Sequence, residues 1–251
     1  EASRLAFADR GLYIADPDFV NIPSGMLSKS YLQSRSKLIN KIATSKTIKP
    51  GQPPAKIAYK FDQGRSPEQD STSHFIIVDR EGNIVSMTST IENGFGSRLM
   101  VNGFLLNNEL TDFSFAPTKN GNQIANSVKA GKRPRSSMAP TIVFKDDQPY
   151  LAIGSPGGSR IINYVTNSLI ALLDWNYPLQ AALDMPHIVN RFGTMDVENN
   201  SKATALVNDF KTLGYKVSER DLNSGLHAVM FTKNGMIGAA DNRREGIALG
   251  D

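Results

Sequence analysis

The chain has 251 residues, of which 40% are apolar and 21% are charged, and its formal net charge is +4. This composition is typical of a globular protein with a packed core, and the length fits one large domain or two small ones. The absence of cysteine excludes disulfides, thiolate metal sites and a cysteine nucleophile. The three histidines, His74, His187 and His227, are too far apart in the sequence to suggest a metal cluster.

Basic residues are scattered, and the two densest clusters, 129–135 and 243–244, are short and contain no interleaved aromatic residues. We interpret them as a solvated surface with some affinity for anionic substrates, so no nucleic-acid partner is expected. No apolar run approaches the roughly 20 residues that span a bilayer, so no membrane span is predicted. The chain opens at Glu1 without an initiating methionine, and we therefore expect it to be a piece of a longer protein.

Apolar residues at helical spacing predict helices over residues 1–15 and 24–44. From Ser45 to Ser71 the composition shifts to Lys, Pro, Gly, Gln and Ser, which predicts a long linker or exposed loop. A loop of this length inside a compact domain usually has a task.

Beyond this loop the pattern changes to paired strands separated by turns. The predicted strands are 75–78 with 84–87, 141–144 with 150–153, and 227–232 with 236–239, with a further strand around Val217 and helices over 158–173 and 201–213. Hairpins between helical segments predict an α/β layered sandwich with mostly antiparallel strands.

Thr72 lies where the loop ends and the first of these strands begins. A threonine hydroxyl is a weak nucleophile until a base removes its proton. Cleavage between Ser71 and Thr72 would free an α-amine with a pKa of roughly 7.7–8.0, which suits a general base near neutral pH. Taken alone, a Ser/Thr pair in this position is more commonly just the start of a strand.

The residues after Thr72 follow a longer pattern of fixed spacing. It consists of Thr72, Ser73, His74, Gly82, Asn83, Val85, Thr88, Thr90, Phe95 and Gly96. This pattern resembles the signature of the γ-glutamyltransferase (γ-glutamyltranspeptidase) family, whose members are N-terminal-nucleophile hydrolases that cut their own backbone to expose a threonine. Ile76 departs from the pattern, because Ser or Thr is usual there, and we expect it to pack on its strand.

The resemblance implies that Thr72 becomes the nucleophile after self-cleavage between Ser71 and Thr72. It also implies that Thr90, on the paired strand, holds the nucleophile's oxygen. The alternative for Thr90 is a β-branched residue that only fills a strand. An N-terminal nucleophile needs no other base, so we interpret His74 as structural.

The segment Gly154-Ser155-Pro156-Gly157-Gly158 follows a predicted strand and precedes a helix. Two consecutive glycines let backbone amides approach an oxygen closely, and the start of a helix adds partial positive charge. A phosphate loop is disfavoured because Gly-Lys-Ser/Thr is missing. The resemblance implies that Gly157 and Gly158 form an oxyanion hole, where each donor is worth about 2.7–4 kcal/mol.

The resemblance also implies a site for the α-carbon end of a γ-glutamyl substrate. Ser136 and Ser137 correspond to a serine pair that binds the α-carboxylate, although without the resemblance they would be a turn. Glu92, Glu109 and Asp112 correspond to positions that face the α-ammonium group. Family members often have Asn and Gln at the positions of Glu92 and Glu109, where carboxylates would attract an ammonium more strongly. The alternative for both glutamates is a solvated loop charge.

The fold that the resemblance implies is an αββα sandwich of the N-terminal-nucleophile hydrolase type, incomplete because the N-terminal part of the large subunit is absent. Residues 1–71 are similar to the C-terminal end of the large subunit with its exposed linker (about 45–71), and residues 72–251 to a whole small, catalytic subunit. The remainder of the large subunit is then an expected partner. In the family it supplies an arginine that pairs with the substrate carboxylate.

The expected activity is γ-glutamyl transfer or hydrolysis of glutathione and related compounds through a γ-glutamyl-threonine acyl-enzyme, with water, an amino acid or a peptide as acceptor. This chemistry requires no metal and no organic cofactor. By analogy with the family we expect a periplasmic or secreted protein. Two alternatives stay open: a related acylase that acts on glutaryl-cephalosporins or poly-γ-glutamate, and an unprocessed or truncated fragment without activity.

Overall fold

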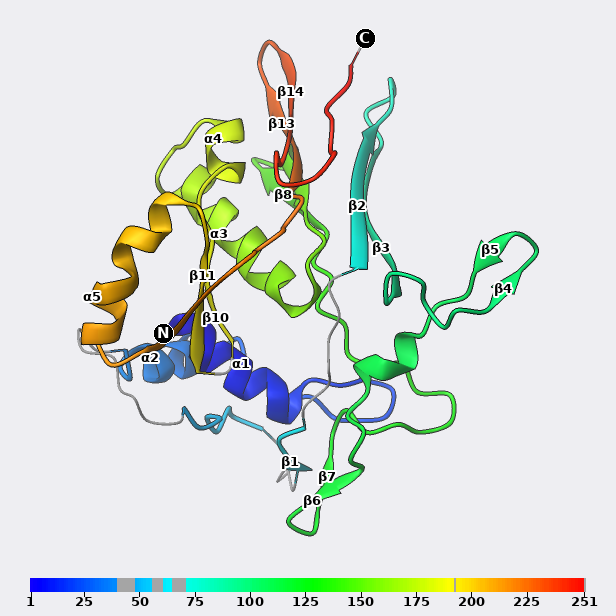
Figure 1. Cartoon of the computed structure of the whole chain (residues 1–251), viewed down its shortest axis with the longest axis vertical. Coiled ribbons are helices and arrows are strands. Elements are labelled where there is room, and N and C mark those ends of the chain that lie inside the picture. Colours follow the sequence, from blue (N-terminus) through cyan, green and yellow to red (C-terminus); the bar gives the residue numbers. More distant parts are fainter. Residues whose placement is uncertain (40–47, 56–60, 65–70, 192, 251) are drawn as a thin grey trace. The chain divides into compact units, whose positions relative to one another are not determined.

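The computed structural model describes residues 1–39, 48–55, 61–64, 71–191 and 193–250 (Figure 1). These residues form two compact units, between which the chain passes several times. The first unit comprises Glu1–Pro67, Glu109–Ser136 and Ile188–Arg220, and the second comprises Glu68–Asn108, Ser137–His187 and Asp221–Asp251.

The first unit contains three α-helices, two short 3₁₀ helices and six strands among its described residues. They are α1 (Ala2–Tyr13), α2 (Lys29–Ser36), β1 (Phe61–Asp62), η1 (Glu109–Asp112), β6 (Thr118–Lys119), β7 (Asn122–Ile124), β10 (Ile188–Asn190), β11 (Thr194–Glu198), η3 (Lys202–Leu206), α5 (Val207–Thr212) and β12 (Lys216–Arg220). One sheet has the order β10-β11-β12, with β12 parallel to β11, and the other has the order β1-β7-β6.

Helices α1 and α2 are joined by a buried carboxylate. Asp9 on α1 accepts hydrogen bonds from the Tyr31 hydroxyl (2.7 Å), from Arg35 Nη2 (3.2 Å) and from the backbone N–H of Gly51 (2.7 Å). A buried charge is tolerated when it is paired and hydrogen-bonded in this way. The hydrogen bonds that Asp9 accepts from Tyr31 and Arg35 therefore help to fix how α1 and α2 pack against each other.

The second unit is built on antiparallel strands. Its elements are β2 (Ser71–Val78), β3 (Ile84–Glu92), β4 (Met100–Val101), β5 (Phe104–Leu105), β8 (Thr141–Lys145), β9 (Gln148–Gly154), η2 (Gly158–Arg160), α3 (Ile161–Leu173), α4 (Leu179–Leu183), β13 (His227–Thr232) and β14 (Gly235–Ala240). A four-stranded sheet has the order β14-β13-β9-β8. The β2–β3 hairpin contacts β9 and β13 on one side of this sheet, and α3 and α4 pack on the other (Figure 1).

Strand β9 lies at the centre of the second unit. Leu151, Ala152 and Ile153 are all fully buried, as a strand covered on both faces requires. From α3, Ile161 and Tyr164 are also almost completely buried. The continuous apolar run of β9 is thus explained by a hairpin on one face and helices on the other.

The mixed α/β class predicted from the sequence is confirmed, and each predicted strand pair appears as a hairpin. The predicted helix over 24–44 is shorter in the structure, where α2 spans Lys29–Ser36, and residues 40–47 lie outside the described part. The predicted linker lies partly outside the described residues. Within it, Phe61–Asp62 form β1, which pairs in parallel with β7.

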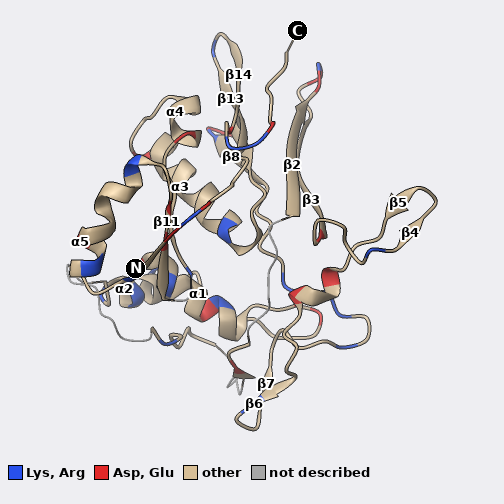
Figure 2. Cartoon of the chain, viewed as in Figure 1, with Lys and Arg blue, Asp and Glu red and all other residues tan. Residues whose placement is uncertain are grey.

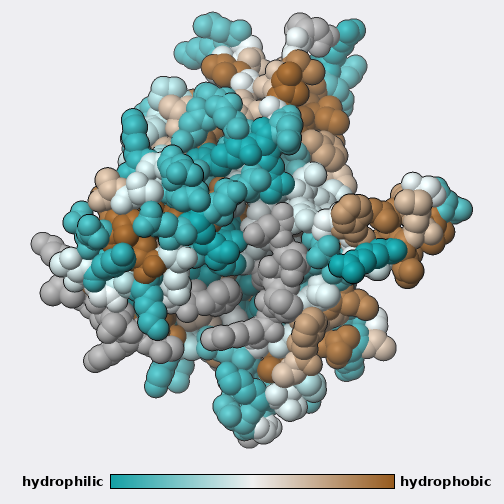
Figure 3. Space-filling model, in the orientation of Figure 1, coloured by the Kyte–Doolittle hydropathy of each residue, from teal (hydrophilic) through white to brown (hydrophobic). Residues whose placement is uncertain are grey.

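Two surfaces of the second unit expose apolar side chains. On the β4–β5 hairpin these are Leu99, Met100, Val101 and Phe104, and the hairpin forms an apolar projection in Figure 3. On the β2–β3 hairpin they are Phe75, Ile77, Val85 and Met87, which the strand register places on one face. Exposed apolar patches of this kind mark interaction surfaces.

Charged residues are spread through both units in the coloured part of the chain (Figure 2). The interpretation of the two basic clusters as a solvated surface is wrong for three of their arginines: Arg135 is only 7% exposed, and Arg243 and Arg244 are partly buried and donate hydrogen bonds within the second unit. No helix among the described residues has both the length and the apolar composition that crossing a membrane requires.

Candidate active site

The β2–β3 hairpin brings Thr72 and Thr90 opposite each other. Their backbones are register partners, and the register shifts between Ser71 and Thr72. A local irregularity of this kind re-aims the side chains beside it. The Thr72 hydroxyl donates to Thr90 Oγ1 over 3.3 Å, and Thr72 is only 8% exposed.

The hydroxyl of Thr90 is fully used in this arrangement. It donates to the carbonyl oxygen of Ser71 over 2.7 Å, and it accepts from the backbone N–H of Glu92 over 2.8 Å as well as from Thr72. A hydroxyl has one donor and two acceptor positions, so all three are occupied. Thr90 therefore contacts both the hydroxyl of Thr72 and the carbonyl of the peptide bond that precedes it.

Glu92 ends β3 in a constrained position. Its φ of 72° lies in the left-handed region that few residues other than glycine adopt, and the residue is 4% exposed. One carboxylate oxygen accepts a hydrogen bond from Asn108 Nδ2 (3.0 Å), and Asn108 Oδ1 accepts one from the backbone N–H of Asn93 (2.9 Å). Such strain persists where the surroundings hold it, and it concentrates at functional sites.

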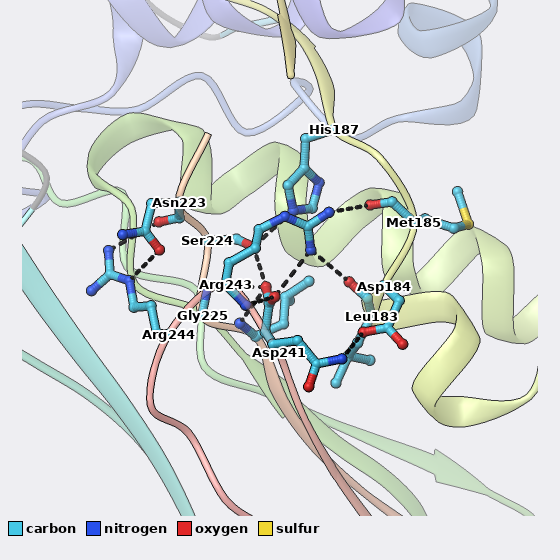
Figure 4. Close-up of polar contacts among 12 residues, drawn as sticks. Leu183, Asp184, Met185, His187, Asn223, Ser224, Gly225, Asp241, Arg243 and Arg244 are labelled. Atoms are coloured by element: carbon cyan, nitrogen blue, oxygen red, sulfur yellow. Dashed lines mark hydrogen bonds and ion pairs between the residues drawn. The ribbon is translucent and has the colours of Figure 1, made fainter. Parts of the chain in front are cut away.

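Arg244 reaches Thr72 from the other end of the chain, a contact that sequence reasoning missed. Its Nη1 donates to the Thr72 carbonyl oxygen over 3.1 Å. Its Nε and Nη2 donate to the side-chain and backbone oxygens of Asn223, each over 3.0 Å (Figure 4). The sequence showed Arg244 only as half of a short basic cluster, and no local pattern distinguished it from a solvated charge.

Gly225 makes this approach possible. Its φ is +77°, and a β-carbon placed on it would lie 2.7 Å from Arg244 Cδ and 2.9 Å from Pro156 Cγ. Both distances are too short for any side chain to fit. The loop after β9, which carries Pro156, Gly157 and Gly158, therefore packs close to the arginine that contacts Thr72.

Gly157 and Gly158 both have positive φ values, of 130° and 58°. A β-carbon at Gly157 would lie 2.6 Å from the Tyr164 ring, so this position requires glycine on two grounds. The pair stands in the second unit together with Thr72 and Thr90, at the start of η2 and α3. Its role as an oxyanion hole stays a prediction.

A buried network around Asp241 holds the segment of Arg244 in place. Asp241 Oδ2 accepts hydrogen bonds from the Ser224 hydroxyl and from the N–H groups of Gly225 (3.0 Å) and Leu226 (3.2 Å). Asp241 Oδ1 accepts from the N–H (2.9 Å) and Nη1 (3.0 Å) of Arg243 (Figure 4). Burial acts to raise the pKa of Asp241, but these donors bring it below the usual value of an aspartate.

His187 joins this network without forming a catalytic triad. Its Nε2 lies 2.7 Å from Ser224 Oγ. Because the Ser224 hydroxyl donates its proton to Asp241, the histidine is the donor in this contact, and the serine is not activated as a nucleophile. Burial, with the nearby Arg243 charge, lowers the pKa of His187 to about 3, so the ring is neutral. Ser224 is fully buried, and the cluster is structural.

His74 also has a packing role. Its Nδ1 is 2.8 Å from Thr88 Oγ1, and burial, followed by the neighbouring His227, lowers its pKa to about 4. Its ring lies against the α-carbon of Gly154, where a β-carbon would come within 2.2 Å of it. These contacts agree with the interpretation of His74 as structural.

The remaining predicted site residues are divided between the units. Ser137 belongs to the second unit, whereas Glu109, Asp112 and Ser136 belong to the first. Glu109 and Asp112 form the ends of η1, and the carbonyl of Ser136 accepts a hydrogen bond from Arg10 Nη2 (3.3 Å). Their grouping with Thr72 around one substrate stays a prediction. Within the described residues, no group of three or more His, Cys, Asp or Glu side chains is placed to hold a metal ion.

The site of the second unit thus combines three features. The hydroxyl of Thr72 is buried, the hydroxyl of Thr90 donates a hydrogen bond to the carbonyl oxygen of the preceding residue, and the guanidinium of Arg244 donates one to the carbonyl oxygen of Thr72 itself. This arrangement suits acyl transfer at an oxygen nucleophile.

Comparison with known proteins identifies the class. The family model described as Gamma-glutamyltranspeptidase matches residues 1–251. The chain therefore belongs to the γ-glutamyltranspeptidase family, a family of enzymes that includes glutathione hydrolases.

Three curated relatives illustrate the range of the family. The chain is 38% identical to a glutathione hydrolase proenzyme of Bacillus subtilis (strain 168), over 100% of this chain and 44% of the relative. It is 33% identical to the capsule biosynthesis protein CapD proenzyme of Bacillus anthracis (98% and 42%) and 31% identical to the acylase ACY 1 proenzyme of Pseudomonas sp. (strain SE83; 99% and 42%). The chain thus spans less than half the length of these relatives.

Among solved structures, γ-glutamyltranspeptidase from Pseudomonas nitroreducens complexed with L-DON is similar with a TM-score of 0.63 and 30% identity. The match covers 71% of this chain and 98% of that one.

Proposed function

We propose that the protein cuts its own chain between Ser71 and Thr72 and then transfers or hydrolyses γ-glutamyl groups through an acyl-enzyme on Thr72. The observation that carries this proposal is the position of the Thr90 hydroxyl, which contacts both Thr72 Oγ1 and the carbonyl oxygen of Ser71. The natural donor in this proposal is glutathione or a related γ-glutamyl compound.

In the self-cleavage step, Thr72 Oγ1 bonds to the carbonyl carbon of Ser71 and the peptide C–N bond breaks. The hydroxyl proton passes to the nitrogen of Thr72, which becomes a free amine, and Ser71 is left as an ester. Thr90 stabilises the negative charge that develops on the Ser71 oxygen, since its donor already lies 2.7 Å from that atom. Water then hydrolyses the ester and restores the hydroxyl.

In turnover, the amine of Thr72 removes the proton of its own hydroxyl as this attacks the γ-carbonyl of the donor. The amides of Gly157 and Gly158 hold the oxyanion, and the protonated amine supplies the proton with which the leaving amine departs. Water, an amino acid or a peptide then takes the γ-glutamyl group from Thr72. Arg244 fixes the carbonyl of Thr72 throughout, so that the nucleophile keeps its orientation.

Substrate recognition in this proposal uses the two charged groups on the α-carbon of the substrate, the ammonium and the carboxylate. Glu92, Glu109 and Asp112 attract the ammonium group, and Ser136 and Ser137 bind the carboxylate. The low exposure of Glu92 supports this role, because a buried carboxylate interacts with a cation more strongly than a solvated one.

The proposed fold is the αββα sandwich, with residues 1–71 as the end of a large subunit and 72–251 as the small subunit. The exposed apolar face of the β2–β3 hairpin supports it, since a further layer packed there would bury Phe75 and Ile77. The comparison also supports it, because 71% of this chain matches 98% of the chain from P. nitroreducens. That share is close to the length of the segment from Thr72 to Asp251.

An acylase that takes glutaryl groups is the second candidate, favoured by the relative from Pseudomonas sp. (strain SE83). A glutaryl group has no α-ammonium. It would leave the buried carboxylate of Glu92 facing no positive charge of the substrate. Comparing turnover of γ-glutamyl-p-nitroanilide with that of glutaryl-p-nitroanilide separates the two candidates.

The proposal is tested with the protein expressed from its complete gene, as wild type, Thr72→Ala and Thr72→Ser. We expect the wild type to yield two polypeptides, the smaller with Thr72 at its N-terminus by mass spectrometry. Thr72→Ala stays uncut and inactive, and Thr72→Ser cleaves because the hydroxyl is kept. Cleavage at the same bond in Thr72→Ala would refute the proposal.

A further inference from the structure

Asn126 is a buried residue of the first unit, only 2% exposed, and its side-chain amide joins two segments of that unit. Its Nδ2 donates to the carbonyl oxygen of Asp112 over 2.7 Å. Its Oδ1 accepts from the backbone N–H of Arg135 over 2.9 Å, and its backbone carbonyl accepts from the N–H of Ser114 over 2.9 Å. One short side chain therefore joins the end of η1 to the residue just before Ser136.

Asparagine suits this position because its amide donates and accepts at the same time. A leucine of similar size could do neither, and an aspartate could accept from Arg135 but not donate to a carbonyl. Replacing the amide by a carboxylate would instead place two acceptors against each other in a buried setting, which is costly.

Residues 133–135, which Asn126 contacts through the backbone N–H of Arg135, also hydrogen-bond residues near the end of α1. Arg135 Nη1 donates to the carbonyl of Arg10 at the end of α1 (3.0 Å). Arg133 donates from its backbone N–H to Asp16 (2.8 Å) and pairs with the same carboxylate through its guanidinium (2.9 Å). The residues just before Ser136 are thus fixed to α1 and to Asp16, three residues beyond it. Since they are fixed, the amide of Asn126 sets where η1 lies relative to Ser136.

We propose that Asn126 is a positioning residue that fixes the spacing between Asp112 and Ser136, and so couples recognition of the α-ammonium to recognition of the α-carboxylate. This inference rests on the proposed function, in which these two residues bind those two groups. Both groups are carried by one carbon atom, so their partners must be held within about 0.5 Å of the productive geometry. Asn126 touches neither group and acts through the backbone of Asp112 and Arg135.

The test uses four p-nitroanilides that differ only in the α-substituents of the acyl group. γ-Glutamyl carries both groups, glutaryl lacks the ammonium, 4-aminobutyryl lacks the carboxylate, and butyryl lacks both. kcat/KM is measured for the wild type, for Asn126→Asp and for Asn126→Ser, each expressed from the complete gene. Asn190→Asp is the matched control, because Asn190 is another buried asparagine of the first unit, 5% exposed, on β10.

For the γ-glutamyl anilide we expect Asn126→Asp to lower kcat/KM roughly tenfold, the factor that corresponds to about 1.4 kcal/mol for one lost hydrogen bond. The butyryl anilide should change less than twofold, because it uses neither Asp112 nor Ser136. Asn126→Ser should show the same selectivity in weaker form. Asn190→Asp should leave the ratios of kcat/KM among the four anilides the same as in the wild type.

An equal loss for all four anilides, or no loss for any, would overturn the inference and assign Asn126 to stability alone. Failure of both Asn126 variants to fold, while Asn190→Asp folds, leads to the same conclusion. The proposed function fails in a different way, which is visible in the wild type: γ-glutamyl and butyryl anilides would then be turned over equally well.

Discussion

The Thr90 hydroxyl donates a hydrogen bond of 2.7 Å to the carbonyl oxygen of Ser71, the carbonyl that the proposed self-cleavage attacks. The same hydroxyl lies 3.3 Å from Thr72 Oγ1. In the proposed reaction, one side chain thus contacts the attacked carbonyl oxygen before cleavage and the nucleophile afterwards.

Replacing Thr90 by Val should slow self-cleavage by about 10²–10³-fold, because the transition state loses a donor worth about 2.7–4 kcal/mol. The appearance of two polypeptides over time, followed by gel electrophoresis, measures this rate. Thr90→Ser is the matched control, since it keeps the hydroxyl and loses only a methyl group. Cleavage of Thr90→Val at the wild-type rate would show that this donor has no part in the reaction.

Replacing Arg244 by Gln should lower kcat about tenfold, because the Thr72 carbonyl loses a charged donor worth roughly 1.5–3 kcal/mol. Asn223→Ala should give a smaller loss in the same direction, since Asn223 holds Arg244 at two nitrogens and does not itself hydrogen-bond Thr72. Arg80→Gln removes an exposed arginine from the β2–β3 turn and is the charge-matched control. Equal kcat values for Arg244→Gln and Arg80→Gln would contradict the positioning of Thr72 by Arg244.

Replacing Gly154 by Ala should destabilise the protein by about 1–3 kcal/mol, the usual cost of forcing an extra methyl group into a packed core. The new β-carbon would lie 2.2 Å from the ring of His74, which is only 5% exposed and is held by its hydrogen-bond contact with Thr88. Gly11→Ala in α1 is the control, because its β-carbon meets nothing closer than 3.7 Å and helix propensity favours alanine. Thermal unfolding should show opposite shifts of Tm, and a stable Gly154→Ala would be evidence against this packing.

Stability should fall as the pH is lowered from about 6.5 towards 4. Burial lowers the pKa of His187 to about 3 and that of His74 to about 4, whereas both have the ordinary value of 6.5 when the chain is unfolded. In this window the unfolded state binds more protons than the folded state, so stability rises with pH by up to about 1.4 kcal/mol per pH unit for each histidine.

Urea unfolding at a series of pH values measures this slope. His187→Asn removes one titrating group and keeps a hydrogen-bond donor for Ser224. The slope of the free energy of unfolding against pH should therefore decrease by the contribution of one histidine. An unchanged slope would mean that His187 is not the source.

Much of the second unit could be predicted from the sequence because its signals are local. The Gly82-Asn83 and Asn234-Gly235 turns each separate two alternating strands, which is sufficient to predict a hairpin. The spacing from Thr72 to Thr90 then placed both threonines on one hairpin, where the structure has them facing each other.

The contacts of Arg244 and Asp241 could not be predicted, because they depend on how distant segments meet. Asp241 follows β14 and Ser224 precedes β13, so their contact requires the register of that hairpin. His187 comes from a third segment, after α4. Nothing in the spacing of these residues along the chain reveals the network, and their residue types are common on surfaces.

The hydrogen bond from Arg244 to the carbonyl oxygen of Thr72 joins two positions separated by 172 residues. During synthesis, Thr72 is therefore made well before Arg244, the residue that contacts its carbonyl oxygen. If the proposed function is right, the order of translation thus leaves Thr72 without this positioning contact until residue 244 has been made.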